Sequence, residues 1–386
     1  MNLRGSIRRS QSCVTDARDA VREFHAGVAQ ADMALVLFFC SSEYDLDVLG
    51  EEMARLFAGV QVAGCTTAGE IGIAGYREHS ISGASFPASE FTSVTGRIGH
   101  LQQFDAAKGQ AFAQAQLQKL ERAAPQAVSQ NSFALLLTDG LSEREELVTH
   151  ALQNALAKVP LVGGSAGDGL RFRSTHVYID GRFHPDSAVM ILVTTPLPFT
   201  LFKIQHFVPT DETMVVTEAD PVHRVINEIN GLPAAAEYAR VIGVKVSDLN
   251  PMRFAASPVV VLIDDTVYVR TIQKANPDGS LTFACAIDAG LVLHMARGVD
   301  LVTNMEQSFA AIQDKIGPLQ VVLGFDCIHR KLENLRNGLI DRVGDVFKQY
   351  NTIGFNTYGE QFGGVHINQT LTGIAIGAAA LPKHNA

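Results

Sequence analysis

Reactive and charged side chains follow one apolar run in the C-terminal part of the chain. Residues 321–325 have the composition of a buried strand, and Cys327 and Arg330 come shortly after it. Side chains at the carboxyl end of a strand in an open α/β sheet commonly reach a ligand crevice. Arg330 could clamp a carboxylate through its guanidinium fork, and Cys327 could be a soft ligand or a redox thiol. An ordinary buried cysteine and a surface arginine would give the same pattern.

A second concentration of polar residues lies between two apolar runs near the C-terminus. It contains Tyr358, Glu360, His366 and Asn368. A tyrosine, a glutamate and a histidine so close together could orient a small ligand. A Gly-Gly pair at 363–364 lies among them, so the same residues could equally form a β-hairpin.

A histidine in apolar surroundings is the third candidate. His206 is flanked by Phe202, Phe207 and Val208. Such an imidazole is usually a hydrogen-bonded core histidine, although it can also be a metal ligand. The sequence contains no H-E-x-x-H metal motif and no C-x-x-C-H haem-attachment motif. Residue chemistry alone therefore leaves the role of His206 open.

The glycine-rich segment 163–168 shares letters with two functional motifs. It lacks the Lys-Ser/Thr ending of a P-loop and the spacing of a dinucleotide fingerprint. It also matches G-x-S-x-G, but β-like residues follow where a nucleophile elbow needs a helix. We therefore predict a tight packing turn rather than a nucleotide or hydrolase site.

An internal repeat in the N-terminal half indicates the scaffold that positions these residues. Each copy has a strand, a helix and a loop of small residues: 35–40, 46–57 and 63–70 in the first, 135–138, 143–158 and 162–169 in the second. Gly64 follows Leu35, and Gly164 follows Leu135, by the same 29 residues. The pattern predicts a mixed α/β (α+β) fold with a repeated strand-helix-strand unit, in which small residues let backbones approach closely.

Composition sets broader limits. A chain of 386 residues with 47% apolar and 18% charged residues can form two domains with substantial cores. Prolines interrupt the pattern near residue 200, which predicts domains at 1–200 and 201–386. The net charge of −9 argues against binding to nucleic acid or an anionic membrane surface. No run has the length of a signal peptide core or a membrane span, so we expect a cytoplasmic protein.

Two local patterns predict helix starts. Ser142 and Glu145 have the spacing of a capping box, in which each side chain bonds the backbone of the other residue. Asp220 followed by Pro221 predicts a helix over 221–230, with Gly231 ending it.

Four segments of the chain also resemble a known family. Segments 63–70 and 162–181 resemble the N-terminal half of the FIST sensory family, and segments 326–330 and 354–370 resemble its C-terminal half. Together they span nearly the whole chain in the expected order. The resemblance implies a two-domain FIST architecture and an intracellular sensory module for a small ligand, not an enzyme.

One bacterial branch of that family, the nitric-oxide-sensing (NosP) proteins, binds haem and modulates a partner histidine kinase in biofilm or cyclic-di-GMP signalling. This chain is similar to that branch because we expect it to carry the two FIST halves alone. The resemblance implies haem b as cofactor and nitric oxide as signal. His206, followed by Phe207, is then the first candidate for the axial iron ligand and His366 the second. Arg330 would pair with a haem propionate.

Two alternatives stay open at this point. The first is a FIST sensor of a small carboxylate or amino acid held by Arg330, Glu360 and Tyr358, without haem. The second is an enzyme that uses Cys327 or Cys65 as a nucleophile. In either case a homodimer is a base-rate expectation.

Overall fold

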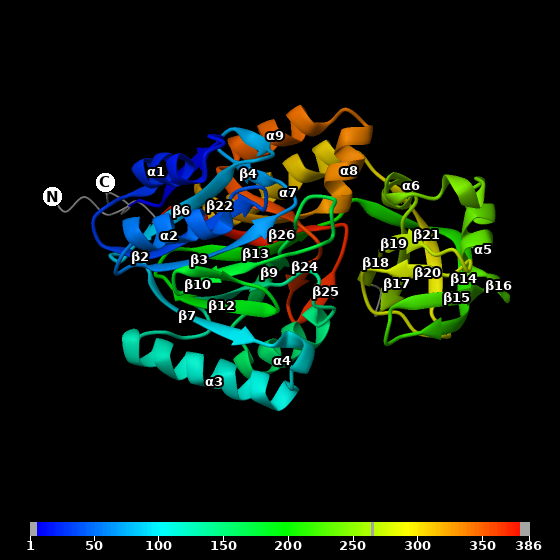
Figure 1. The fold of residues 1–386 in the computed structure, drawn as a ribbon, viewed down its shortest axis with the longest axis horizontal. Coiled ribbons are helices and arrows are strands. Elements are labelled where there is room, and N and C mark those ends of the chain that lie inside the picture. The colour runs from blue at the N-terminus through cyan, green and yellow to red at the C-terminus, as the bar shows by residue number, and fades with distance from the viewer. Residues whose placement is uncertain (1–5, 264–265, 379–386) are drawn as a thin grey trace, which may run out of the picture.

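The chain folds into a large body and a smaller β-rich region beside it (Figure 1). The computed structural model describes residues 6–263 and 266–378. Within these ranges the strands form four sheets, and nine α-helices accompany them. The mixed α/β class is therefore confirmed.

Three six-stranded sheets make up the body, and all three have the same strand order. The first contains β1 (Arg8–Ser12), β6 (Ile81–Pro87), β2 (Met33–Ser41), β3 (Gln61–Thr67), β10 (Val177–Ile179) and β11 (Arg182–His184). The second contains β7 (Thr92–Gly99), β12 (Ser187–Thr194), β8 (Ser132–Thr138), β9 (Leu161–Ser165), β24 (Glu360–Phe362) and β25 (Val365–Ile367). The third contains β13 (Phe199–Ile204), β26 (Leu371–Gly377), β22 (Leu319–Cys327), β23 (Thr352–Thr357), β4 (Glu70–Gly72) and β5 (Gly75–Arg77).

Three copies of one unit produce this order by exchanging hairpins. Each sheet has a parallel central pair: β2 with β3, β8 with β9, and β22 with β23. The hairpin beside each pair comes from another copy. Thus β10 pairs with β3, β24 with β9, and β4 with β23. The boundary at residue 200 stays a prediction, and strand pairing joins residues from both sides of it.

Helices cover the outer faces of the body sheets, and the inner faces share one core (Figure 1). The covering helices are α1 (Ala17–Val28) and α2 (Leu46–Leu56) on the first sheet, α3 (Ala106–Ala123) and α4 (Glu145–Leu156) on the second, and α7 (Leu301–Ile316) and α9 (Ile340–Gln349) on the third. In the shared core, Phe39 of β2 packs against Phe325 and Phe355 of the third sheet. Among the helices in the described ranges, none is long and apolar enough to cross a membrane.

The smaller region is inserted between β13 and β22, and we call residues 207–298 the inserted region. Its sheet contains, in order, β18 (Thr266–Arg270), β17 (Val259–Ile263), β21 (Val292–Gly298), β14 (Phe207–Asp220), β15 (Val225–Ile229), β20 (Leu281–Phe283) and β19 (Ile272–Ala275), with β16 (Leu232–Pro233) on β15. Helices α5 (Ala234–Val241) and α6 (Pro251–Ala256) complete a separate apolar core. Helix α8 (Ile328–Arg336) belongs to the body and follows β22 directly.

The predicted repeat is confirmed, and the structure adds a third copy around β22 and β23. The packing-turn interpretation of segment 163–168 is also confirmed. A Cβ atom added at Gly163 would lie 1.9 Å from the Leu136 carbonyl oxygen, so only glycine allows β8 and β9 to approach this closely.

The predicted helix over 221–230 is wrong, because this segment contains strand β15. Asp220 does accept hydrogen bonds from the backbone N–H groups of Val222 and His223, at 3.1 and 3.2 Å. These bonds close a turn instead of starting a helix. The following β-branched residues favour a strand, and they pair with β14 in antiparallel register.

The predicted capping box is also wrong. The Ser142 hydroxyl donates to the Asp139 carbonyl, and α4 begins only at Glu145. The Glu145 carboxylate instead lies 3.1 Å from Arg224 of the inserted region. A long-range ion pair therefore replaces the local cap.

Candidate functional site

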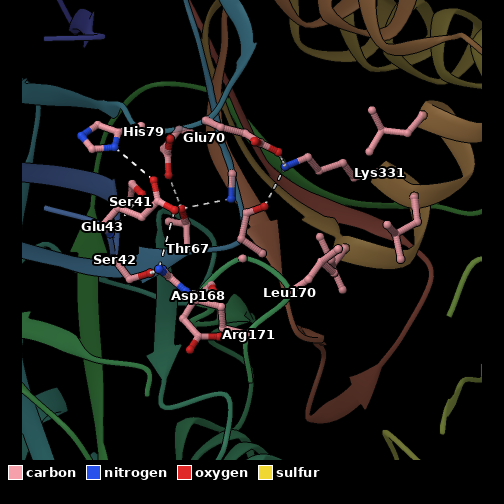
Figure 2. Close-up of a pocket in the computed structure, with 17 residues that line it drawn as sticks. Ser41, Ser42, Glu43, Thr67, Glu70, His79, Asp168, Leu170, Arg171 and Lys331 are labelled. Atoms are coloured by element: carbon pink, nitrogen blue, oxygen red, sulfur yellow. Dashed lines mark hydrogen bonds and ion pairs between the residues drawn. The ribbon is translucent and has the colours of Figure 1, made fainter. Parts of the chain in front are cut away.

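A cavity opens at the carboxyl ends of the parallel strands in the body, where open α/β sheets commonly bind ligands (Figure 2). All three copies contribute to it through residues that end or follow β2, β3, β9 and β22. Its volume is about 240 Å³. The lining residues are Ser41, Ser42, Glu43, Thr67, Ala68, Gly69, Glu70, Glu78, His79, Asp168, Gly169, Leu170, Arg171, Ile328, Lys331, Leu332 and Leu335.

Two cations border the cavity (Figure 2). Lys331 of α8 donates from Nζ to the Ala68 carbonyl at 2.9 Å and to the Glu78 carboxylate at 2.8 Å. The Lys331 side chain is only 7% exposed, and its ammonium has three N–H donors. One donor therefore remains for a ligand. Arg171, on the loop after β9, donates to the Ser42 hydroxyl at 2.5 Å.

The cavity also contains a buried acid. Glu70 contacts the Thr67 hydroxyl and accepts hydrogen bonds from the backbone N–H and the hydroxyl of Ser80, at 3.0 and 2.8 Å. Burial raises the pKa of Glu70 to about 7, although these hydrogen bonds and the charge of Lys331 favour the ionised form. The carboxyl of Glu70 therefore changes its charge near neutral pH.

The cavity presents both signs of charge within a small volume. Each cation pairs with a more exposed carboxylate: Lys331 with Glu78 at 2.8 Å and Arg171 with Glu43 at 3.6 Å. His79 Nδ1 also lies 3.1 Å from Glu43. A ligand that carries both a carboxylate and an ammonium group could pair with both sets. The volume lies below the range of about 300–1,000 Å³ that is typical of pockets for drug-sized ligands. The cavity therefore suits a molecule of amino-acid size.

Two of the residues singled out in the sequence, Arg330 and His206, contact each other outside this cavity. Arg330 Nε donates to Asp326 at 2.7 Å, and its Nη1 lies 3.1 Å from His206 Nδ1. His206 Nε2 lies 3.0 Å from the Glu333 carboxylate. Phe207 packs beside the His206 ring, at 4.1 Å between ring centroids, within a small apolar cluster of the inserted sheet. Arg330 is thus an internal ion-pair partner rather than a surface arginine.

The arrangement around His206 does not fit haem. Because a guanidinium can only donate, His206 Nδ1 accepts from Arg330, and Nε2 carries the proton donated to Glu333. Burial lowers the pKa of His206, against the opposing effect of Glu333, so the ring is neutral. Both nitrogens are engaged, and neither offers a lone pair to an iron atom. Iron ligation at His206 would require these bonds to break.

His366 is in a similar position. Its Nδ1 lies 3.3 Å from the nitrogen of the Gln361 side-chain amide. Burial lowers the pKa of His366 to about 3. It lines a gap of about 80 Å³ between body and inserted region, much smaller than a haem pocket. Within residues 6–263 and 266–378, no group of three or more His, Cys, Asp or Glu side chains could hold a metal ion.

Tyr358 and Glu360 do not join Arg330 in one cavity. The Tyr358 hydroxyl donates to the Asp168 carboxylate and lies 3.0 Å from the Gly169 carbonyl oxygen. Glu360 is fully buried and is held by Thr357 and Thr370, in the same way that Thr67 and Ser80 hold Glu70. Tyr358 therefore joins the third copy to the loop after β9, and Glu360 joins the end of β23 to the residue before β26 within the third copy.

The candidate thiols are inaccessible. Cys65 and Cys327 are fully buried, and burial raises the pKa of each thiol well above its usual value. A nucleophilic cysteine needs access and a lowered pKa. This environment does not favour the enzyme alternative.

Sequence reasoning missed Lys331 and Arg171 as site residues. Lys331 had a detectable signal, because it interrupts an otherwise apolar helical face formed by Ile328, Leu332 and Leu335. The loop that contains Glu70 was recognised as part of the repeat, but its acid was not considered as a site residue. Arg171 lies on an irregular loop and has no such pattern.

Comparisons with known proteins identify the family. Among curated proteins, none matches the chain. A solved structure described as "Cyanuric acid hydrolase: evolutionary innovation by structural concatenation" is similar with 10% sequence identity and a TM-score of 0.38, over 96% of this chain and 100% of that chain. A TM-score this low carries no argument about function. The FIST N domain model matches residues 34–232 and the FIST C domain model matches residues 234–363. The chain therefore belongs to the FIST family, whose domains are sensors in signal transduction.

Proposed function

We propose that this protein senses a small carboxylate or zwitterion, such as an amino acid, bound in the cavity at the carboxyl ends of β2 and β3. One observation carries the proposal. Lys331 is almost buried, keeps an N–H donor free, and lies in a cavity of amino-acid size that also presents Glu43 and Glu78. The ligand carboxylate would bind Lys331 and Arg171, and an ammonium group would bind the glutamates.

Such a protein acts by binding rather than by turnover, and its output requires a partner signalling protein. A cytoplasmic histidine kinase is the partner that the family resemblance implies. A ligand that binds only the folded state also stabilises it, which gives a direct assay.

We expect at least one member of a panel of the twenty amino acids and the C3–C5 dicarboxylates to raise the melting temperature in a concentration-dependent way. We expect Lys331→Met to weaken that ligand by about 10- to 150-fold, because a charge-assisted hydrogen bond contributes about 1.5–3 kcal/mol. Titration calorimetry of wild type and variant with the selected ligand measures this change.

Lys348→Met is the matched control. Lys348 lies on α9, outside the cavity, and its ammonium pairs with Asp345. The Lys348→Met variant makes the same chemical change outside the cavity, so we expect it to bind the ligand with wild-type affinity. The proposal would be contradicted if no compound of the panel raised the melting temperature at 10 mM. It would also be contradicted if Lys331→Met bound the selected ligand with wild-type affinity.

Sensing of nitric oxide through haem b stays a prediction with its own test. Because both His206 nitrogens have partners, we expect protein supplied with haem b to show the broad absorption of unbound haem. Spectra of wild type, His206→Ala and His366→Ala, with and without nitric oxide, measure this. A sharp Soret band that shifts with nitric oxide and disappears in one variant would instead favour the haem sensor and identify the ligand.

A further inference from the structure

Helix α8 has two opposite faces that contact different parts of the molecule. Arg330 and Glu333 lie on one face and hold the ring of His206. Successive residues of an α-helix point about 100° apart around its axis. By this measure, Arg330 and Glu333 point on average in the direction roughly opposite, about 180°, to the α8 residues that line the cavity. The cavity-lining residues of α8 are Ile328, Lys331, Leu332 and Leu335.

His206 lies where the chain crosses from the body to the inserted region. The body strand β13 ends at Ile204, and the inserted strand β14 begins at Phe207. The chain returns through β21 and Gly298, where an added Cβ atom would lie 3.4 Å from the His206 ring. The Val299 N–H then donates to the His206 carbonyl at 2.8 Å. Both crossings therefore meet at His206.

The contacts between α8 and this crossing are buried. The His206 side chain is fully buried, and that of Glu333 is 13% exposed. Helix α6 of the inserted region also packs against α8. A short helix moves as a rigid element, so a shift of α8 must either carry His206 with it or break these hydrogen bonds.

We infer that α8 couples occupancy of the cavity to the orientation of the inserted region. Lys331 is the contact on the ligand side, and His206 is the contact on the hinge side. A ligand carboxylate that binds the free N–H of Lys331 acts on the same ammonium group that Ala68 and Glu78 hold, and these bonds fix the helix from the cavity. The inference rests on the proposed function for its ligand, and it gives that ligand a route to a change of shape.

The coupling can be tested without any ligand by hydrogen exchange of the backbone. Lys331→Met removes the bonds to Ala68 and Glu78 but leaves Arg330 and Glu333 unchanged. We expect exchange in segments 204–209 and 296–300 to accelerate at least tenfold. Arg171→Met is the control, because it removes a cation from the same cavity but lies outside α8; the crossings should exchange as in wild type.

A second variant tests the reverse direction, because coupling between two sites is reciprocal. Glu333→Gln weakens the hold on His206 and should accelerate exchange of the cavity loop 66–70, whereas Glu121→Gln on the exposed face of α3 should not. Hydrogen exchange in β8 reports any global destabilisation, so the exchange rates of segments 204–209 and 296–300 are compared with that of β8. The inference would be overturned if Lys331→Met left the exchange rates of segments 204–209 and 296–300 unchanged and Glu333→Gln left that of loop 66–70 unchanged. It would also be overturned if Arg171→Met accelerated exchange in segments 204–209 and 296–300 as much as Lys331→Met does. Since no ligand is used, a failed ligand panel would leave this result unaffected.

Discussion

Replacing Arg330 by methionine is expected to lower the free energy of unfolding by about 3–5 kcal/mol, the usual cost of removing one partner of a buried ion pair. The side chains of Arg330 and Asp326 are 1% and 0% exposed, and Nε lies 2.7 Å from the carboxylate. Methionine would fill much of the space but would leave Asp326 as a buried charge. Among the residues that the structure describes, Tyr76 and Asn356 would be its remaining side-chain hydrogen-bond donors. Urea denaturation at pH 7 measures the loss.

Two further variants separate the charge effect from the loss of packing. Arg240→Met breaks the ion pair with Glu237, but the Arg240 side chain is 65% exposed, so we expect a much smaller loss. Asp326→Asn combined with Arg330→Met removes the unpaired charge, and it should recover part of the stability lost in the single variant. An Arg330→Met loss no larger than that of Arg240→Met would contradict the internal role assigned to Arg330.

The sequence predicted the repeated unit because its signal is local. Strand, helix and small-residue loop follow one another within a few tens of residues, and the periodicity of each element is visible in its own segment. The third copy was missed because α8 and α9 both lie between β22 and β23, where the earlier copies have one helix. The hairpin exchange was also missed, because β4 pairs with a strand almost three hundred residues away and no local pattern reports that pairing.

The candidate site shows the same division between local and long-range signals. The carboxyl end of β22 was correctly expected to face a crevice, yet the residue that faces it is Lys331 and not Arg330. Neighbours on a helix point in directions about 100° apart, so a one-residue difference decides between cavity and core. His206 has the apolar surroundings expected from its sequence, but its partners Arg330 and Glu333 lie more than a hundred residues away. Only the folded chain shows that its nitrogens are occupied.

The second large effect is expected from pH. The contribution of two buried acids to the free energy of unfolding should fall as pH rises from about 5 to 8, because these acids keep their protons in the folded state. The buried His329 and His366, whose pKa values are lowered, contribute in the opposite direction below about pH 6.5, so the effect of the acids is measured against variants that cannot ionise. Burial raises the pKa of Glu70 to about 7 and that of Glu360 to about 8, from a usual value of 4.5. Between these values each acid binds more protons in the folded chain than in the unfolded chain, so its contribution to stability decreases with pH. Each group contributes a slope of about 1.4 kcal/mol per pH unit while it is neutral only in the folded state.

Glutamine at these positions keeps the shape and the hydrogen-bonding capacity of a neutral acid but cannot ionise. Relative to wild type, the free energy of unfolding of Glu360→Gln should increase by about 3–5 kcal/mol between pH 5 and pH 8. Urea denaturation of both proteins at both pH values measures this increase. For Glu70→Gln the gain should level off near pH 7 and be smaller. Glu121→Gln, an exposed change on α3, should follow wild type at every pH.

Equal pH profiles for wild type and both buried variants would contradict the raised pKa values. The two positions also differ in consequence, because Glu70 lines the cavity and Glu360 does not. If Glu70 ionises near pH 7, it adds a negative charge near Lys331, and a bound carboxylate should weaken above that pH. Glu70→Gln should remove this weakening, whereas Glu360→Gln should leave it in place, so the same two variants assign the pH dependence of ligand binding to one carboxyl group.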